Sequence, residues 1–460
     1  MSRSVRSLLP ALLTGCLVMA ACAETETTAT TAAPESVPAT DAPSTVPAPD
    51  TTGAPAPETT TVSGPSVAEQ WALDYVGGTS GEASGEPVRI GWASASDFFP
   101  DADVAAEAVV AYVNGKLGGI GGRPMELVKC AMSVPEDGAK CGAQFANDES
   151  IVMVVNGQSL VGSADLYTAL QGKKPVYTAA PSGIDDFLSQ VTVSYFAGAL
   201  GAGMGLASFL SSDITPKSIA FVITDDAAGR GGYAVLEPIL KRAGAELRPV
   251  FVQPTATAPE VEAALQAVQA GSAEAIGIGL FEQGCIAAYD ALKNLGIDAT
   301  AVPVVSVAPC RGPAVQEHLK SVGDANLVPN GWYYTGAGFN LFTGNAESGT
   351  DSFIDVLTAA GRPELVYTVG TEEVVSGMMS MVKHLNAAAG DFSFATLDNL
   401  IRSFEGPVMS TAGIMGCGKP ILFKGICATK VSVTRYVDGK WEDTRVGDNA
   451  VDIEPFLVTA

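Results

Sequence analysis

Short apolar segments alternate with helical segments twice along the chain, and this alternation restricts the fold more than any other feature. In the first set, apolar segments at 86–93, 125–130, 151–155 and 175–178 are separated by helical segments at 102–116, 136–147 and 164–170. The second set has apolar segments at 218–224, 249–253, 275–280 and 302–307, and helical segments at 233–243, 259–270 and 283–295. Such alternation is typical of parallel sheets with helices on both faces. We therefore predict an α/β fold built from two doubly wound units.

The C-terminal part of the chain departs from this alternation. Its pattern predicts three helices, at 351–360, 366–388 and 394–403, and then β segments at 421–423, 428–436 and 441–446. Asp438 and Gly439 lie between the last two segments, and an Asp-Gly pair in that position is a hairpin signal.

The N-terminus has the composition of a secretory signal. Arg3 and Arg6 precede an apolar run at 8–21, which is shorter than the roughly 20 residues that span a bilayer as a helix. The segment resembles a bacterial lipoprotein signal, in which the cysteine at the cleavage site is lipidated. The residues before Cys16 match the cleavage motif of lipoprotein signals better than those before Cys22. Cleavage at Cys16 would leave an apolar mature start, however, so we expect lipidation at Cys22, which ends a signal peptide of residues 1–22. An ordinary signal peptide with incidental cysteines is the alternative.

Residues 23–85 are predicted to form a disordered tether. Most of this stretch consists of Thr, Ala, Pro and Ser, which bury too little apolar surface to fold. We therefore expect the folded part to be extracytoplasmic, anchored by lipid to the outer face of the cell membrane. The net charge of −24 argues against a nucleic-acid partner, because nucleic-acid-binding surfaces are basic.

Six cysteines lie outside the signal segment. An even number of cysteines in an exported chain indicates disulfides, and six permit fifteen pairings. No CxxC motif is present and both histidines, His318 and His384, are far from any cysteine, so we predict no metal site. The cysteines fall along the chain as three local pairs, Cys130 with Cys141, Cys285 with Cys310 and Cys417 with Cys427.

No motif predicts a catalytic residue or a cofactor. The Gly-rich segment 201–205, about twenty residues before Asp225, lacks the GxGxxG spacing of a dinucleotide site, and we interpret it as close helix packing. A Ser-His-acid triad would need His318 or His384, and both lie in segments typical of ordinary amphipathic helices. The adjacent acids Asp225–Asp226 and Glu372–Glu373 could serve acid/base chemistry, but we expect a solvated loop and a solvated helix start.

The expected carboxyl ends of the strands have the composition of a recognition surface. In open α/β sheets, ligands bind beyond these ends. The ends are rich in Ser, Thr, Gly, Asn, Asp and Phe, and they lie at 94–100, 156–159, 178–182, 224–230, 281–283 and 308–311.

Over about residues 86–446 the chain resembles the extracytoplasmic solute-binding proteins of ABC importers, of the leucine/isoleucine/valine-binding kind. The resemblance rests on the order and spacing of the segments 87–91, 118–128, 152–157, 174–177, 218–225 and 433–441. It implies a type I periplasmic-binding-protein fold, with two lobes joined by three crossovers. The implied N-lobe comprises 86–196 and 337–422, and the implied C-lobe comprises 197–336 and 423–460.

The same resemblance implies part of a ligand site. The carboxylate-binding loops of the family are matched by Gln158 and Ser159 and by Thr178 to Ala180, and its second-lobe aromatic is matched by Phe281. Two family features have no counterpart here, a tyrosine expected near Gly229 and an acid expected around 307–310, which argues against a plain branched-chain amino acid as ligand. From the strand ends we add Asp226 and Glu282 as partners for a ligand donor, and Phe98 and Phe99 as side walls.

The function that these features predict is ligand capture without a reaction. We expect a monomeric substrate-binding component that captures a small polar organic solute, amino-acid-like or a related acid or amide, between two lobes and delivers it to an ABC permease. A lipid-anchored ligand sensor of the same fold is the alternative, and an exported hydrolase is a third possibility.

Overall fold

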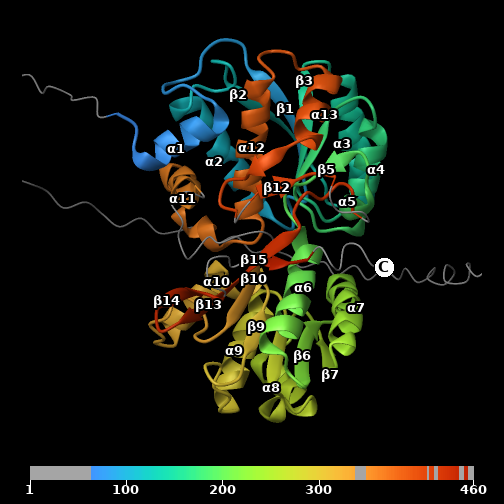
Figure 1. Ribbon diagram of the computed structural model, residues 1–460, viewed down its shortest axis with the longest axis vertical. Helices are drawn as coiled ribbons and strands as arrows, with labels where there is room; N and C mark the ends of the chain where they lie inside the picture. The colour runs from blue at the N-terminus through green and yellow to red at the C-terminus, as the bar shows by residue number, and fades with distance from the viewer. Residues whose placement is uncertain (1–63, 337–348, 412–413, 419–422, 445–449, 454–460) are drawn as a thin grey trace, which may run out of the picture. The chain divides into compact units, whose positions relative to one another are not determined.

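The computed structural model describes residues 64–336, 349–411, 414–418, 423–444 and 450–453 (Figure 1). The chain first forms a five-stranded sheet of strand order β2-β1-β3-β4-β5, in which all neighbours are parallel. Its elements in chain order are β1 (Val88–Ser94), α2 (Pro100–Lys116), β2 (Met125–Ala131), α3 (Pro135–Asn147), β3 (Ile151–Gln158), α4 (Ser163–Leu170), β4 (Val176–Ala180), α5 (Ile184–Leu188) and β5 (Thr192–Val193).

The second sheet has the order β14-β13-β10-β9-β8-β6-β7, and β15 also pairs with β13. It is parallel from β10 to β7 and antiparallel where β13 meets β10, β14 and β15. Its elements are α6 (Gly198–Phe209), a π-turn (Leu210–Ile214), β6 (Ser218–Thr224), α7 (Ala227–Arg242), β7 (Glu246–Val252), α8 (Ala258–Ala267), a 3₁₀ turn (Ala270–Ser272), β8 (Ala275–Gly279), α9 (Glu282–Asn294), β9 (Val304–Ser306), η3 (Ala308–Arg311), α10 (Pro313–Ser321), β10 (Tyr333–Gly336), β13 (Lys430–Val437), β14 (Lys440–Asp443) and β15 (Ala450–Asp452).

Between β10 and β13 the chain returns to the first sheet. This segment contains α11 (Thr350–Ala359), η5 (Pro363–Tyr367), α12 (Thr371–Ala387), α13 (Phe394–Arg402), β11 (Glu405–Pro407) and β12 (Ile414–Gly416). We call the first sheet with its helices and this segment the first lobe, and the second sheet with its helices the second lobe. The chain therefore passes between the lobes three times, and the predicted α/β fold with parallel sheets is confirmed.

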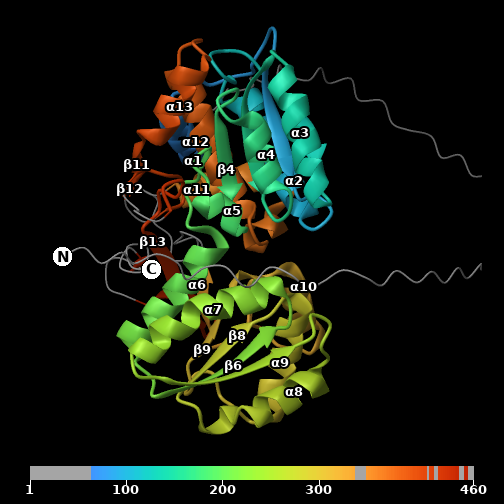
Figure 2. The same ribbon diagram turned by 90° about the vertical axis from the view of Figure 1, so that its right-hand side faces the viewer.

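Helices cover both faces of each sheet, because the side chains of a strand alternate between the faces. In β3, Met153 and Val155 join the core beneath α2 and α12, whereas Val154 joins the core beneath α3 and α4. In β6, Phe221 packs with α6 and α7, and Val222 packs with α8 and α9. Figure 2 shows α3 and α4 in front of the first sheet and α8 and α9 below the second. This layering leaves the carboxyl ends of the strands uncovered by helices.

The first and third crossings lie side by side. Ser194, just after β5, forms a parallel bridge with Ile426. The backbone N–H of Ser194 donates to Gly425 at 2.6 Å, and the N–H of Cys427 donates to Ser194 at 2.8 Å. Two of the three connections between the lobes are therefore tied together by backbone hydrogen bonds.

The folded part begins earlier than predicted, so the predicted tether of residues 23–85 is too long at its C-terminal end. Residues 67–76 form α1 (Val67–Val76), which begins after the N-cap Ser66 and ends at Gly77, in the left-handed conformation. The helix buries Leu73, Tyr75 and Val76 against the first lobe, in contact with α11 and α12. The Thr/Pro-rich composition concealed this short apolar face, which has helical spacing. The predicted signal peptide, Cys22 and residues 23–63 lie outside the described residues.

The structure contains all three of the local cysteine pairs. Cys130 is bonded to Cys141, Cys285 to Cys310 and Cys417 to Cys427. The predicted hairpin is also present, because Val437 of β13 pairs with Lys440 of β14 and the two turn residues both have positive φ. Among the described residues, none of the helices is both long and apolar enough to cross a membrane.

The Gly-rich segment of α6 allows close packing, as predicted. A Cβ at Gly205 would lie 1.9 Å from Val431 Cγ2 of β13, so only glycine permits this approach. A Cβ at Gly201 would lie 2.1 Å from the Cβ of Ala197.

Candidate ligand-binding cavity

A cavity of about 700 Å³ lies where the strand ends of both lobes meet. The first lobe contributes the loops after β1, β3 and β4 and the chain that enters α12, residues 368–373. The second lobe contributes the ends of β6, β8 and β9 together with α6 and α7. Parallel strands place all their carboxyl ends at one edge, which explains why these separate loops converge.

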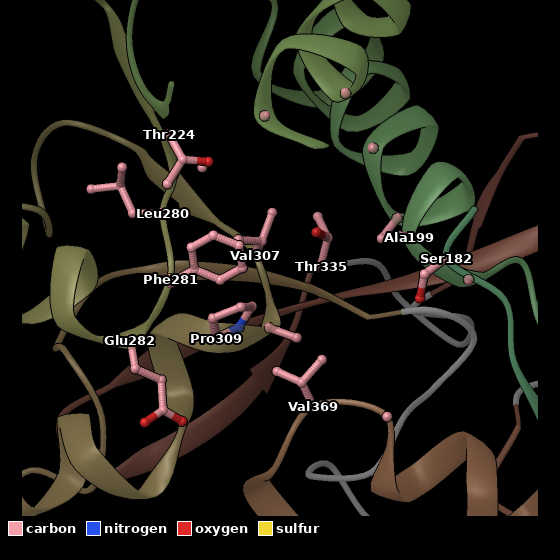
Figure 3. Close-up of a pocket in the computed structure, with 18 of the residues that line it drawn as sticks. Ser182, Ala199, Thr224, Leu280, Phe281, Glu282, Val307, Pro309, Thr335 and Val369 are labelled. Atoms are coloured by element: carbon pink, nitrogen blue, oxygen red, sulfur yellow. The ribbon is translucent and has the colours of Figure 1, made fainter. Parts of the chain in front are cut away.

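The walls of the cavity are mostly apolar. Two aromatic side chains are unusually exposed for their type, since Phe98 has 52% and Phe281 has 47% of its surface accessible. Figure 3 shows the ring of Phe281 directed toward the middle of the cavity, near Val307. The other apolar side chains are Phe99, Leu160, Leu206, Phe221, Ile223, Tyr233, Leu236, Ile278, Leu280 and Val369.

One buried ion pair joins the two lobes at the cavity. Arg311 Nη2 donates to Glu372 Oε2 at 3.0 Å, and both side chains are about 5% exposed. Arg311 ends η3 directly after Cys310, whose disulfide with Cys285 ties η3 to α9. Glu372 lies in the first turn of α12. The guanidinium therefore has a fixed position on the second lobe, facing a helix start of the first.

A second buried carboxylate accompanies this pair. Glu373 follows Glu372 in the first turn of α12 and is 7% exposed. Burial raises the pKa of Glu372 to about 8, with Arg311 opposing the shift and Glu373 adding to it. Burial raises the pKa of Glu373 to about 7, again against the effect of Arg311. The expectation of a solvated helix start was therefore wrong for this pair of acids.

Gln158, a predicted ligand residue, places its amide oxygen beside Gly370, which precedes these acids in the chain. Its Nε2 donates to Ser182 Oγ at 3.2 Å, and Ser182 Oγ in turn donates to the Ala180 carbonyl, which fixes the amide orientation. A Cβ at Gly370, the N-cap of α12, would lie 1.6 Å from Gln158 Oε1. This oxygen is buried and has no hydrogen-bond partner among the described residues.

Ser159 and Thr178 do not line the cavity. Both side chains are fully buried, because the structure uses their hydroxyl groups internally. Ser159 Oγ donates to Asp186, whose carboxylate also accepts the backbone N–H groups of Ser182 and Gly183. Thr178 Oγ1 is hydrogen-bonded to Tyr167 and Thr192. Asp186, from the chain itself, therefore occupies the Ser159 hydroxyl, one of the groups that the resemblance assigned to a ligand carboxylate.

The two acids predicted as partners for a ligand donor are also engaged. Asp226 caps α7, since its Oδ1 accepts the N–H of Gly229 at 2.7 Å, and it does not line the cavity. Glu282 does line it, but its carboxylate accepts the N–H of Ala314 at the start of α10, and burial raises its pKa. In Figure 3 the Glu282 carboxylate points away from the Phe281 ring.

Six of the nine predicted ligand residues line the cavity: Phe98, Phe99, Gln158, Ala180, Phe281 and Glu282. The sequence did not single out Arg311, Glu372, Glu373 or Tyr233 as ligand residues. Arg311 lay within a predicted strand end, at 308–311, so its place near the site was foreseeable. The burial of Glu372 and Glu373 depends on packing between the lobes, which no local pattern indicates.

Neither histidine is among the described residues that line the cavity. His384 Nε2 is hydrogen-bonded to the Tyr195 hydroxyl, and burial lowers its pKa to about 4. His318 Nε2 lies 2.9 Å from Asp290 Oδ1 on neighbouring helices. Both histidines are therefore held by structural partners.

Comparison with known proteins identifies relatives of this architecture. The sequence model of a family described as periplasmic binding protein matches residues 89–418, which is well over half of the chain. Among curated protein sequences, none is significantly similar to this one.

Solved structures share the fold at low sequence identity. An ABC transporter substrate-binding protein from Desulfitobacterium hafniense in complex with Leu has 18% identity and a TM-score of 0.58, over 78% of this chain and 99% of that one. A solute-binding protein of an ABC transporter from Rhodopseudomonas palustris HaA2 in complex with p-hydroxybenzoic acid has 14% identity and a TM-score of 0.59, over 77% and 95%. A leucine-binding protein from Thermotoga maritima has 14% identity and a TM-score of 0.58, over 77% and 97%.

Proposed function

The chain belongs to the periplasmic binding protein family, and on that premise we propose that it is the substrate-binding component of an ABC importer. It captures a small organic solute between its two lobes and delivers it to a membrane permease. The observation that carries this proposal is the cavity of about 700 Å³ at the strand ends of both lobes. Cavities of roughly 300–1,000 Å³ with mostly apolar walls and a few placed polar groups are typical of small-molecule sites.

The relatives support a solute with a substantial apolar part. Leucine and p-hydroxybenzoic acid, which two of the similar structures contain, each join an apolar body to polar ends. The present cavity has the same division, because aromatic and aliphatic side chains form its walls, and three of its charged side chains, Arg311, Glu372 and Glu373, lie at or against the start of α12. A highly hydrated solute such as a sugar would leave these walls without a partner.

The protein works outside the cytoplasm, held by a lipid on Cys22. The apolar run at 8–21 and the polar start after Cys22 support this part of the proposal. The Thr/Ala/Pro-rich residues 23–63 then act as the tether between the lipid and α1. Extracytoplasmic placement agrees with the three disulfides, which form and persist in oxidising compartments.

The capture step is tested by ligand retention. The mature protein is incubated with a small-molecule extract, freed from unbound solutes by gel filtration and denatured, and the released compounds are identified by mass spectrometry. We expect retention of a solute small enough for the cavity. In the control variant Ala199→Trp, an indole at an exposed position on α6 occupies part of the cavity and obstructs it, and retention of the solute should fall. Undiminished retention by this variant, or retention by neither protein, would contradict capture in this cavity.

The delivery step is tested by uptake of the retained solute. Cells that lack this chain but keep their permeases should lose high-affinity uptake, and expression of the wild-type chain should restore it. Normal uptake in cells without the chain, accompanied by a lost response to the solute, would favour a sensor.

A further inference from the structure

The charged groups of the cavity are unbalanced. Four acidic side chains and one basic side chain lie among the described residues that line it, the acids being Asp101, Glu282, Glu372 and Glu373 and the base Arg311. Arg311 is directed to Glu372, and Glu282 is bonded to the backbone of α10. Glu373 is a buried acid that takes part in neither of these hydrogen bonds, although the charge of Arg311 also acts on it.

Hydrogen-bond acceptors without partners lie near the start of α12. Gln158 Oε1 and Glu372 Oε1 are buried and have no hydrogen-bond partner among the described residues, and both residues line the cavity. Gly370 immediately precedes the first turn of α12, and its contact with Gln158 Oε1 places this oxygen beside that turn. Buried acceptors of this kind are normally satisfied by a donor from protein, water or ligand. Gln158 Oε1 and Glu372 Oε1 therefore still need a hydrogen-bond donor, and Glu373 lies beside Glu372 in the first turn of α12.

The donors around Ser159 that would suit an anion are occupied. The Asp186 carboxylate takes the Ser159 hydroxyl and the N–H groups of Ser182 and Gly183, at 2.9 to 3.0 Å for the two backbone donors. The start of α12 would also favour an anion, since helix N-termini carry partial positive charge. Glu372 and Glu373 lie in that first turn and compensate the charge.

We propose that the solute bound in this cavity carries a positively charged, hydrogen-bond-donating nitrogen, held by Glu373, Glu372 and the amide oxygen of Gln158. The rest of the solute is apolar or aromatic and lies against Phe281. Hydrophobic amines and amidines are the chemical class that fits. The exposed face of Phe281 adds to the preference, because aromatic faces attract cations. This inference rests on the proposed function.

Three probes with a shared apolar body test the charge preference: 2-phenylethylammonium, 2-phenylethanol and 3-phenylpropanoate. Calorimetric titration of the mature protein should give the tightest binding for the ammonium compound. A hydrogen bond to a charged group contributes enough to separate it from the alcohol by about tenfold or more. Equal affinity for the ammonium compound and the alcohol, tighter binding of the propanoate, or no binding of the ammonium compound would overturn the inference.

Substitutions of Glu373 and Gln158 test whether these side chains accept the hydrogen bonds of the solute nitrogen. Glu373→Gln keeps the size of the side chain and removes its charge, and it should weaken binding of the ammonium compound by about tenfold while leaving the alcohol unchanged. The matched control Glu317→Gln removes one charge from the exposed face of α10 and should bind all three probes as the wild type does. Gln158→Met is a second test if Glu373→Gln does not fold. Unchanged ammonium affinity in a folded Glu373→Gln or Gln158→Met variant would contradict the proposed acceptors.

Failure of this inference is distinct from failure of the proposed function. If the retention experiment yields a solute without a basic nitrogen, the cavity captures a ligand but the inference is wrong. If no solute is retained, the proposed function itself is contradicted.

Discussion

Arg311 Nη2 of the second lobe lies 3.0 Å from Glu372 Oε2 of the first, and this buried contact connects the lobes at the cavity. The two residues are 61 positions apart in the chain. The η3 turn, held by the disulfide of Cys310, supplies the guanidinium, and the first turn of α12 supplies the carboxylate. Closure of the lobes therefore brings together two groups that would each be costly to bury alone.

Removing either member of this pair should destabilise the protein more than removing both members together. Arg311→Met leaves Glu372 buried without its counterion, and at pH 9, above the raised pKa of this carboxyl, we expect a loss of about 3–5 kcal/mol in the free energy of unfolding. The double variant Arg311→Met/Glu372→Met removes both charges and should recover most of that loss. Urea denaturation of the wild type, both single variants and the double variant measures the coupling free energy. Additive losses would show that the pair does not stabilise the closed arrangement.

Stability should fall as the pH rises from about 7 to 9. Burial raises the pKa of Glu372 to about 8 and that of Glu373 to about 7, above the ordinary value of 4.5. The folded state therefore holds protons that the unfolded state has released, and this contribution is lost as the pH rises through the folded values. His384, whose pKa burial lowers to about 4 from 6.5, opposes this trend below about pH 7 and is neutral in both states above it.

Urea midpoints across that pH range measure the effect. Glu372→Gln/Glu373→Gln removes both titrating groups and should flatten the curve, whereas Glu317→Gln should keep the wild-type slope. A wild-type curve that is flat or rises with pH would show that these carboxyls do not titrate as described.

Substitutions at Ser159 and Phe281 should have different effects, the first mainly on stability and the second mainly on solute binding. Ser159→Ala deprives the buried Asp186 of a hydrogen bond, and a lost partner of a charged group costs about 1.5–3 kcal/mol of folding free energy. Phe281→Ala removes a ring that is 47% exposed and should change stability little while weakening retention of the captured solute. Denaturation and retention measured on both variants test this division. If a stable Ser159→Ala variant no longer retained the solute, the result would show that the Ser159 hydroxyl does donate to the ligand.

The lipid anchor is tested by fractionation of cells. Cys22→Ala should release the protein from membranes, because a lipid on Cys22 is the proposed attachment. Cys16→Ala should remain membrane-bound and is the matched control. Membrane retention of the Cys22 variant, or release of the Cys16 variant, would contradict lipidation at Cys22.

The sequence predicted the fold well because its determinants are local. Buried strands such as β3 and β6 are short apolar runs, and both faces of each are covered, so their composition alone marks them. The hairpin at Asp438–Gly439 needs positive φ at two positions, which few residue pairs other than Asp-Gly accept readily. The tether boundary was wrong because α1 depends on a few apolar side chains that pack against distant helices.

The candidate site was predicted only in part, for a physical reason. Strand ends locate the cavity, so Phe98, Gln158 and Phe281 were found. Which polar atoms remain free is decided by contacts distant in sequence, such as the Asp186 carboxylate that occupies the Ser159 hydroxyl. No local pattern distinguishes an occupied hydroxyl from a free one, or the buried Glu373 from a solvated acid.

Hydrogen–deuterium exchange of the mature chain, with and without its retained solute, tests capture between the lobes most directly. Binding should slow exchange in both lobes at once, at 98–101, 158–160 and 368–373 of the first and at 281–283 and 307–311 of the second. The Ala199→Trp variant should show a smaller change. Protection confined to one lobe, or protection of surfaces away from these segments, would contradict a solute held between the two lobes.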